Sequence, residues 1–280
     1  MDKDQIVGAV VGFATGDALG MANEFGNNKV YRFEDNPKKN LNKGQWTDDT
    51  QFFMLASDSL LHVKTVDPYD IASRLKKLYA SGEIRSLGYN TGSAIQNLLN
   101  KVPLSKSGAR GQYSCGAGGL SRLLPYTLMD SKLPRSEVKS ILKMTHNNKD
   151  LFKVADGLVD FIELLKTEKS INLTVEDLKS YFPGRLRSSF NAYDSRGYAP
   201  GLISAAMQSF VKHPRDFRAA VIDSVNHLGD SDTRTSLVGF FSGLYNGINR
   251  IPTEFVSGLE AKDTLVSYGH RISGVSYVRN

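Results

Sequence analysis

Two short segments of the 280-residue chain each combine a threonine with two aspartates, and oxygen-rich groups of this kind are able to bind metal ions. Residues 47–49 read Thr-Asp-Asp and stand just before an apolar stripe that begins at Phe52. Residues 230–233 read Asp-Ser-Asp-Thr and stand just before a stripe that begins at Leu237. Both stripes have helical spacing, so we expect each cluster at the N-terminus of a helix. Helix capping would account for one acceptor in each cluster, because Asp and Thr both cap helices and Asp suits the positive end of the helix dipole.

Each cluster supplies more oxygen ligands than a cap uses, since it holds two carboxylates and a hydroxyl. If the two helix starts meet in the fold, four carboxylates would repel one another strongly unless cations lay between them. Hard oxygen ligands suit Mg²⁺ or Mn²⁺, and this many suit two ions. The sequence therefore predicts a two-metal site on the condition that the clusters meet.

Two further segments carry residues that could take part in chemistry. Residues 16–20 (Gly-Asp-Ala-Leu-Gly) end the first apolar stripe, and Glu24 follows them. Residues 105–122 contain five glycines, and glycine lets the backbone approach a ligand closely. This loop lacks the Lys-Ser/Thr ending of a phosphate-binding P-loop, so it is a weak nucleotide motif by itself. Cys115, within the loop, has neither a flanking base nor Cys-x-x-Cys spacing, and we do not expect it to act as a nucleophile.

The elements that must position these residues are helices. Apolar residues recur at helical spacing over most of the chain, with a long stripe from Leu151 to Leu165. Pro68 and Pro214 each follow a residue that could cap a helix, which predicts proline at a first helical position. Long alternating runs flanked by hairpin turns are missing, so we expect an all-α fold. No linker divides the sequence, and residues 1–280 are predicted to form one compact multi-helix domain.

Composition is typical of a globular protein and excludes several classes. Hydrophobic residues make up 40% and charged residues 23% of the chain, which excludes a disordered or fibrous protein. The excess of 35 Lys and Arg over 29 Asp and Glu gives a net charge of +6, but the charges are scattered and do not establish nucleic-acid binding. The single cysteine fits a reducing compartment. With no apolar run of about 18 residues and no basic leader, the sequence predicts a cytoplasmic protein with no membrane partner.

Taken in order, these segments resemble the ADP-ribosylglycohydrolase family. The likeness covers about residues 5–250 and rests on the Gly-Asp-Ala-Leu-Gly segment, on Trp-Thr-Asp-Asp-Thr at 46–50, on Thr-His-Asn at 145–147 and on Gly-Asp-Ser-Asp-Thr at 229–233. The Thr-Asp-Asp-Thr and Asp-x-Asp-Thr pair in this order is highly specific. The resemblance implies an all-α hydrolase that cleaves the N- or O-glycosidic bond between ADP-ribose and a modified acceptor and releases ADP-ribose. It implies an ADP-ribosylated protein, or another ADP-ribose conjugate, as the partner.

The resemblance also implies roles for individual residues. Two Mg²⁺ or Mn²⁺ ions would be held by Thr47, Asp48, Asp49, Asp230, Asp232 and Thr233. The catalytic residues, which would position or deprotonate a metal-bound water, would be Glu24, Asp48 and Asp49. The contacts to ADP-ribose would come from Gly111, Tyr113, Ser114, Cys115, Gly116, Gly118, His146 and Tyr198.

This sequence departs from the family pattern in two places. The glycine loop is longer than the common form and has Cys115 near the usual asparagine position, while Ser86 stands where arginine-directed members tend to carry an aspartate. Two alternatives stay open: a non-catalytic ADP-ribose-binding or crystallin-like structural protein, and a hydrolase of another ADP-ribose derivative. The presence of all six predicted metal ligands favours the enzyme. We expect a monomer, and nucleic acid is the less favoured partner.

Overall fold

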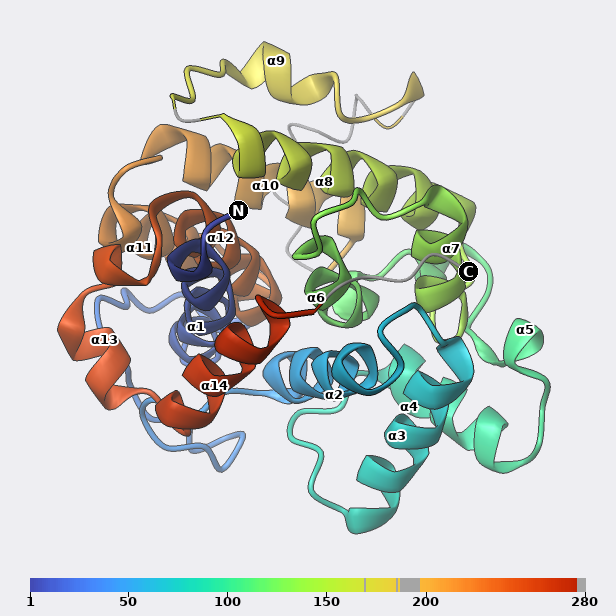
Figure 1. Cartoon of the computed structure of the whole chain (residues 1–280). Helices are drawn as coiled ribbons and strands as arrows, with labels where there is room; N and C mark the ends of the chain where they lie inside the picture. The colour runs from blue at the N-terminus through green and yellow to red at the C-terminus, as the bar shows by residue number, and fades with distance from the viewer. Residues whose placement is uncertain (169, 185, 187–196, 276–280) are drawn as a thin grey trace.

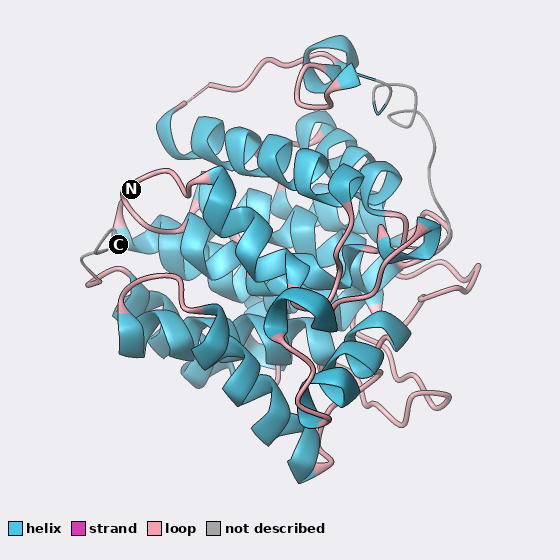
Figure 2. Cartoon of the chain, turned by 90° about the vertical axis from the view of Figure 1, so that its right-hand side faces the viewer, coloured by secondary structure: helices cyan, strands magenta, loops and turns pink. Residues whose placement is uncertain are grey.

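The computed structural model describes residues 1–168, 170–184, 186 and 197–275, and within them the regular elements are helices. Figure 1 shows the helices in chain order, and Figure 2 shows helix and loop throughout the described part of the chain. The prediction of an all-α fold is therefore confirmed. In the described part, no helix has both the length and the apolar character needed to cross a membrane.

The α-helices follow one another with short 3-10 turns between some of them. Their bounds are α1 (Lys3–Gly20), α2 (Asp48–Val63), α3 (Pro68–Ser81), α4 (Tyr89–Leu99), α5 (Leu104–Ser107), α6 (Leu124–Thr127), α7 (Arg135–Lys143), α8 (Lys149–Thr167), α9 (Val175–Lys179), α10 (Ala199–Lys212), α11 (Phe217–Val225), α12 (Ser231–Asn246), α13 (Thr253–Gly258) and α14 (Lys262–Ile272). The 3-10 turns are η1 (Gln112–Ser114), η2 (Ala117–Arg122) and η4 (Ile248–Arg250).

Local sequence explains where most of these helices begin. The Asp67 side chain caps α3, with Pro68 as its first residue, as the sequence predicts. The prediction for Pro214 is wrong, because Pro214 lies in the turn between α10 and α11. Helix α11 begins at Phe217 instead, where the Asp216 side chain accepts a hydrogen bond from the backbone N–H of Ala219. A capping acceptor at Asp216 outweighs the proline signal.

Helices α1 and α12 pack with their backbones in direct contact (Figure 1). Every residue from Ile6 to Gly20 is buried, so α1 runs through the interior. The contact is made by glycines spaced four residues apart on both helices. A Cβ added to any of them would lie 2.3 Å or less from a backbone oxygen of the facing helix; they are Gly8, Gly12, Gly16 and Gly20 on α1, and Gly239 and Gly243 on α12. The absence of side chains at these positions allows the close approach.

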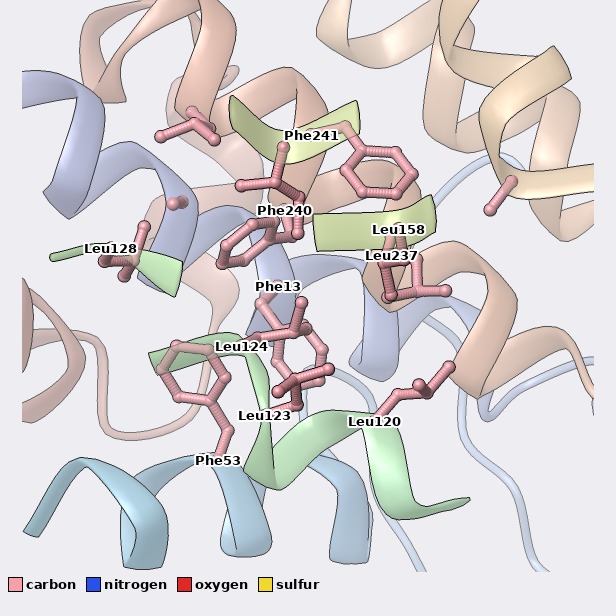
Figure 3. Packing of buried hydrophobic residues seen from close by; sticks show 14 of the residues in the cluster. Phe13, Phe53, Leu120, Leu123, Leu124, Leu128, Leu158, Leu237, Phe240 and Phe241 are labelled. Atoms are coloured by element: carbon pink, nitrogen blue, oxygen red, sulfur yellow. The ribbon is translucent and has the colours of Figure 1, made fainter. Parts of the chain in front are cut away.

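The hydrophobic core joins α1 and α12 to α2. The ring of Phe13 stacks on that of Phe53 with 4.8 Å between centroids, and Phe53 meets Phe240 edge-on at 6.4 Å. Figure 3 shows these three rings beside leucines of the segment that includes η2 and α6. Because the end of α1 and the N-termini of α2 and α12 carry the predicted site residues, this packing holds their positions relative to one another.

Candidate functional site

The end of α1 and the N-termini of α2 and α12 meet at one pocket of about 320 Å³. The two Thr-Asp clusters, far apart in sequence, come into contact here, since the Thr233 hydroxyl donates to Asp49 Oδ2 at 2.8 Å. The condition on which the two-metal prediction depends is therefore met. The residues that line the pocket are Glu24, Asp48, Asp49, Ser86, Gly88, Tyr89, Asn90, Tyr113, Gly116, Ala117, Gly118, Gly197, Asp230, Asp232 and Thr233.

Asp17, on the last turn of α1, organises the start of α2. Its carboxylate accepts hydrogen bonds from the backbone N–H and hydroxyl of Thr47, at 3.1 and 2.8 Å, and from those of Thr50, at 3.0 and 2.7 Å. The Thr47 hydroxyl also accepts from the backbone N–H of Asp49 at 3.3 Å, so it caps α2 and keeps one lone pair free. Sequence analysis noted the segment but gave Asp17 no role. A carboxylate at the end of the mainly apolar stretch from Ile6 to Leu19 was the signal that could have found it.

The N-terminus of α12 is fixed against the end of α1. The Ser231 hydroxyl donates to the carbonyl oxygen of Gly20 at 2.7 Å. Asp230 caps α12 by accepting from the backbone N–H of Thr233 at 3.3 Å, and Asp232 Oδ1 accepts from the same N–H at 2.9 Å. The backbone N–H groups at the two helix starts thus engage one oxygen each of Thr47, Asp230 and Asp232, and they leave most of the oxygens of both clusters for another purpose.

Glu24 is held beside α12 by the turn that follows α1. The backbone N–H of Phe25 donates to the carbonyl oxygen of Gly229 at 2.8 Å, which places Glu24 next to the start of α12. The Glu24 carboxylate forms an ion pair with Lys39, whose Nζ also lies 3.2 Å from Asp232 Oδ2. Lys39 could not be recognised from the sequence, because this residue stands in a polar loop with no periodic pattern.

Buried carboxylates dominate the electrostatics of the pocket. Burial, followed by the neighbouring charges of Asp17 and Asp232, raises the pKa of Asp49 to about 8. Burial and the neighbouring aspartates also raise the pKa values of Asp48 and Asp230 well above their ordinary range. Carboxyl groups with raised pKa values hold protons or attract cations at neutral pH. The pocket therefore favours positive charge.

The donor set consists of four carboxylates and two hydroxyls, and these hard oxygen atoms fit Mg²⁺ or Mn²⁺. Among the residues that the structure describes, no three or more His, Cys, Asp and Glu side chains form a group that could hold a metal ion. Some of the donors are engaged with other partners, Asp232 with Lys39 and Asp49 with Thr233. The chemistry of the donors fits the ions. The contacts of Asp232 with Lys39 and of Asp49 with Thr233 must break before these donors can surround a metal ion.

The residues predicted to contact ADP-ribose are divided between this pocket and the next. Gly116 and Gly118 line the carboxylate pocket. Gly111, Cys115 and Tyr198 line an adjacent pocket of about 600 Å³, together with residues 147–150 and Lys153. The backbone N–H of Ala199 donates to the carbonyl oxygen of Cys115 at 2.9 Å and holds the glycine loop against α10.

Two of the predicted contacts lie behind the loop rather than at its surface. Ser114 is 1% exposed and donates to the carbonyl oxygen of Gly111 at 2.6 Å. His146 is 3% exposed and shares a hydrogen bond with the Thr145 hydroxyl, which in turn contacts Arg122. Burial, followed by the charge of Arg122, lowers the pKa of His146 to about 3, so the ring is neutral. Tyr113, by contrast, is 84% exposed and lines the carboxylate pocket, and its carbonyl oxygen accepts a hydrogen bond from Asn90 Nδ2 at 2.9 Å.

An ion pair between Arg85 and Glu260 supports the loop that precedes α2. Arg85 pairs with Glu260 through both terminal nitrogens, at 2.5 and 3.0 Å, and its guanidinium lies 4.5 Å from the centre of the Trp46 ring. The carbonyl oxygen of Arg85 accepts from the backbone N–H of Asp48 at 3.1 Å. A bidentate pair of this kind holds the loop before α2, and with it Asp48, in a defined position.

Comparisons with known proteins identify the family and the fold of the chain. A family model described as ADP-ribosylglycohydrolase matches residues 1–280. The chain is 25% identical to ADP-ribosylarginine hydrolase Tri1 of Pseudomonas putida (strain GB-1), over 90% of this chain and 73% of that protein. It is 24% identical to ADP-ribosyl-[dinitrogen reductase] glycohydrolase of Rhodospirillum rubrum, over 92% and 91% of the two chains. A solved structure named ADP-ribosylglycohydrolase-related protein complex matches with a TM-score of 0.80 and 26% identity, over 96% of this chain and 97% of that one.

Proposed function

The chain belongs to the ADP-ribosylglycohydrolase family, and from this premise we propose that it hydrolyses the N- or O-glycosidic bond between ADP-ribose and a modified protein side chain. Free ADP-ribose and the unmodified side chain would be the products. The observation that carries the proposal is the meeting of the two Thr-Asp clusters, where Thr233 of α12 contacts Asp49 of α2 in one carboxylate-lined pocket.

We further propose that the pocket takes two Mg²⁺ or Mn²⁺ ions. Such ions, when bound, supply positive charge that polarises water and orients the hydroxyls of the ribose beside the scissile bond. The raised pKa values of Asp49 and its neighbours support this proposal, because a cation would stabilise the ionised form of these carboxyls. The residues that would hold the ions are Thr47, Asp48, Asp49, Asp230, Asp232 and Thr233.

The side chains of the pocket divide the remaining work. Glu24 lies nearer to solvent than Asp232, with 16% of its side chain exposed compared with 7%, and it would take a proton from the attacking water. The aspartates would stabilise the positive charge that develops on the ribose in an oxocarbenium-like transition state. In the adjacent pocket, Lys149 and Lys153 supply positive charge that suits the pyrophosphate of ADP-ribose.

The test is release of ADP-ribose from arginine-, serine- and nucleic-acid-linked substrates, in the presence of Mg²⁺, Mn²⁺ or EDTA. We expect release from one linkage, its loss in EDTA, and its loss in a variant that combines Asp230→Asn with Asp232→Asn. The matched control is Asp216→Asn, because Asp216 caps α11 away from the pocket and asparagine caps as well as aspartate.

The control separates metal binding from capping. If Asp230 and Asp232 served only to cap α12, the double variant would stay as active as Asp216→Asn, and the metal assignment would be wrong. Release that is insensitive to EDTA would contradict it as well. Binding of ADP-ribose without release from any linkage would favour the non-catalytic alternative.

A further inference from the structure

Lys39 places a positive charge among the residues proposed to bind metal and to act on water. Its ammonium pairs with the carboxylate of Glu24 and lies 3.2 Å from Asp232 Oδ2. The exposed fraction of the side chain is 17% for Lys39 and 7% for Asp232, so these contacts lie mostly out of solvent. Ion pairs sheltered from water are screened less than those on an open surface.

The backbone that carries Lys39 is anchored. Asn36 and Leu41 form a reciprocal pair of backbone hydrogen bonds of 2.8 and 3.2 Å, and the N–H of Lys39 donates to the carbonyl oxygen of Asn36 at 3.1 Å. The side-chain amide of Asn36 donates to the carbonyl oxygen of Met21, just after the end of α1, at 2.6 Å. Leu41 is buried. An ordered turn fixed to α1 therefore directs the ammonium into the pocket.

A lysine ammonium and a divalent ion cannot both contact the same carboxylate oxygen, because like charges at that separation repel strongly. We propose that Lys39 is a built-in counter-cation that competes with the divalent ion for Asp232, so that metal binding displaces the Lys39 ammonium and releases Glu24 from its ion pair. This inference rests on the proposed function, since it requires the pocket to bind metal.

The competition has two opposite consequences for a variant without the charge. Without metal, the ammonium offsets repulsion among the carboxylates, so its loss lowers the thermal stability of the metal-free protein. With metal, the ion no longer has to displace a cation, so its affinity rises. If Lys39 had only a structural role, its removal would lower the metal affinity instead of raising it, because a disturbed pocket binds metal more weakly.

The experiment measures the Kd of Mn²⁺ by titration calorimetry on metal-stripped protein, together with the Tm in EDTA and in saturating Mn²⁺. Lys39→Met keeps the unbranched shape and most of the length of the side chain and removes its charge. We expect Mn²⁺ to bind it about tenfold more tightly than the parent, as for removal of one neighbouring charge. We also expect a lower Tm in EDTA that saturating Mn²⁺ restores.

Three further variants make the result specific. Lys38→Met removes the charge of an exposed neighbour in the same turn and should match the parent in both quantities. Lys39→Arg keeps the charge and should not tighten binding. Lys39→Gln, which keeps a hydrogen-bond donor, should tighten it and replaces Lys39→Met if that variant folds poorly.

The outcomes distinguish the inference from the function on which it rests. An Mn²⁺ affinity in Lys39→Met and Lys39→Gln that equals or falls below that of the parent overturns the competition and leaves the metal site standing. If the parent and every variant fail to bind Mn²⁺, the proposed metal site is refuted, and the inference fails with it.

Discussion

Adding one methyl group at Gly16 tests whether the backbone contact between α1 and α12 fixes the geometry of the pocket. A Cβ at this position would lie 2.0 Å from the carbonyl oxygen of Thr235, 2.5 Å from its carbonyl carbon and 2.7 Å from the Cα of Ser236. All three are backbone atoms of a buried helix, so no side chain can rotate away. Real Cβ atoms essentially never lie closer than 3.0 Å to such atoms. To raise the shortest distance to this value, α1 and α12 must move apart by 3.0 − 2.0 = 1.0 Å or more.

The magnitude follows from two opposing effects. Forcing an extra carbon into a packed core costs about 1–3 kcal/mol, and three backbone clashes favour the upper end of that range. Alanine gains about 1 kcal/mol over glycine in the interior of a helix. We therefore expect Gly16→Ala to lower the free energy of unfolding by about 2 kcal/mol. Because Asp17 is the next residue, the same displacement should weaken Mn²⁺ binding.

The assay is equilibrium unfolding in urea followed by circular dichroism, with Gly92→Ala as the control. Gly92 lies in α4, where the nearest atom to an added Cβ is the flexible tip of Leu87 at 3.3 Å. We expect this control to be unchanged, or more stable by up to about 1 kcal/mol. If Gly16→Ala proves as stable as the parent, the two helices can separate without cost and the reasoning is refuted.

Three other residues give independent tests. Burial raises the pKa of Cys115 to about 12, so the thiol is protonated at neutral pH; Cys115→Ser should keep most of the activity, and complete loss would show that the thiol takes part. Burial lowers the pKa of His146 to about 3, below its ordinary 6.5, so protonation favours the unfolded chain. The stability contributed by the neutral ring is intact above pH 6.5 and should fall by about 2 kcal/mol between pH 7 and pH 5, as measured by urea unfolding; an equally steep fall in His146→Gln would contradict this. Asp17→Asn turns an amide toward a backbone N–H of Thr47 or Thr50 and should weaken Mn²⁺ binding about tenfold, as measured by calorimetry; unchanged affinity would show that Asp17 does not position Thr47.

What could be predicted from the sequence was mainly local. The cap at Asp67, the stripe from Leu151 to Leu165 and the placement of both Thr-Asp clusters at helix starts follow from propensity and periodicity within one segment. The start of α11 depends on two competing local signals, the proline at 214 and the capping side chain of Asp216, and the cap decides where the helix begins.

What could not be predicted depends on contacts between distant segments. That the clusters meet follows from the close packing of α1 on α12, which the four-residue spacing of their glycines makes possible. This spacing is visible in the sequence, but a glycine shows no preference for a particular partner helix. Lys39 carried no periodic or motif signal, because its position depends on the turn between Asn36 and Leu41 and on where the end of α1 lies.

The packing of α1 on α12 also affects how the protein is made. Ser231, at the start of α12, binds Gly20 of α1 across 211 residues of chain. At about 5–20 residues per second, a ribosome would need on the order of ten seconds or more to deliver this partner after α1 has been synthesised. During that interval the apolar segment from Ile6 to Gly20 lacks the helix that covers its glycine face. We therefore expect nascent chains that end before α12 to be prone to aggregation and to bind chaperones, and the pocket to form only after α12 has left the ribosome.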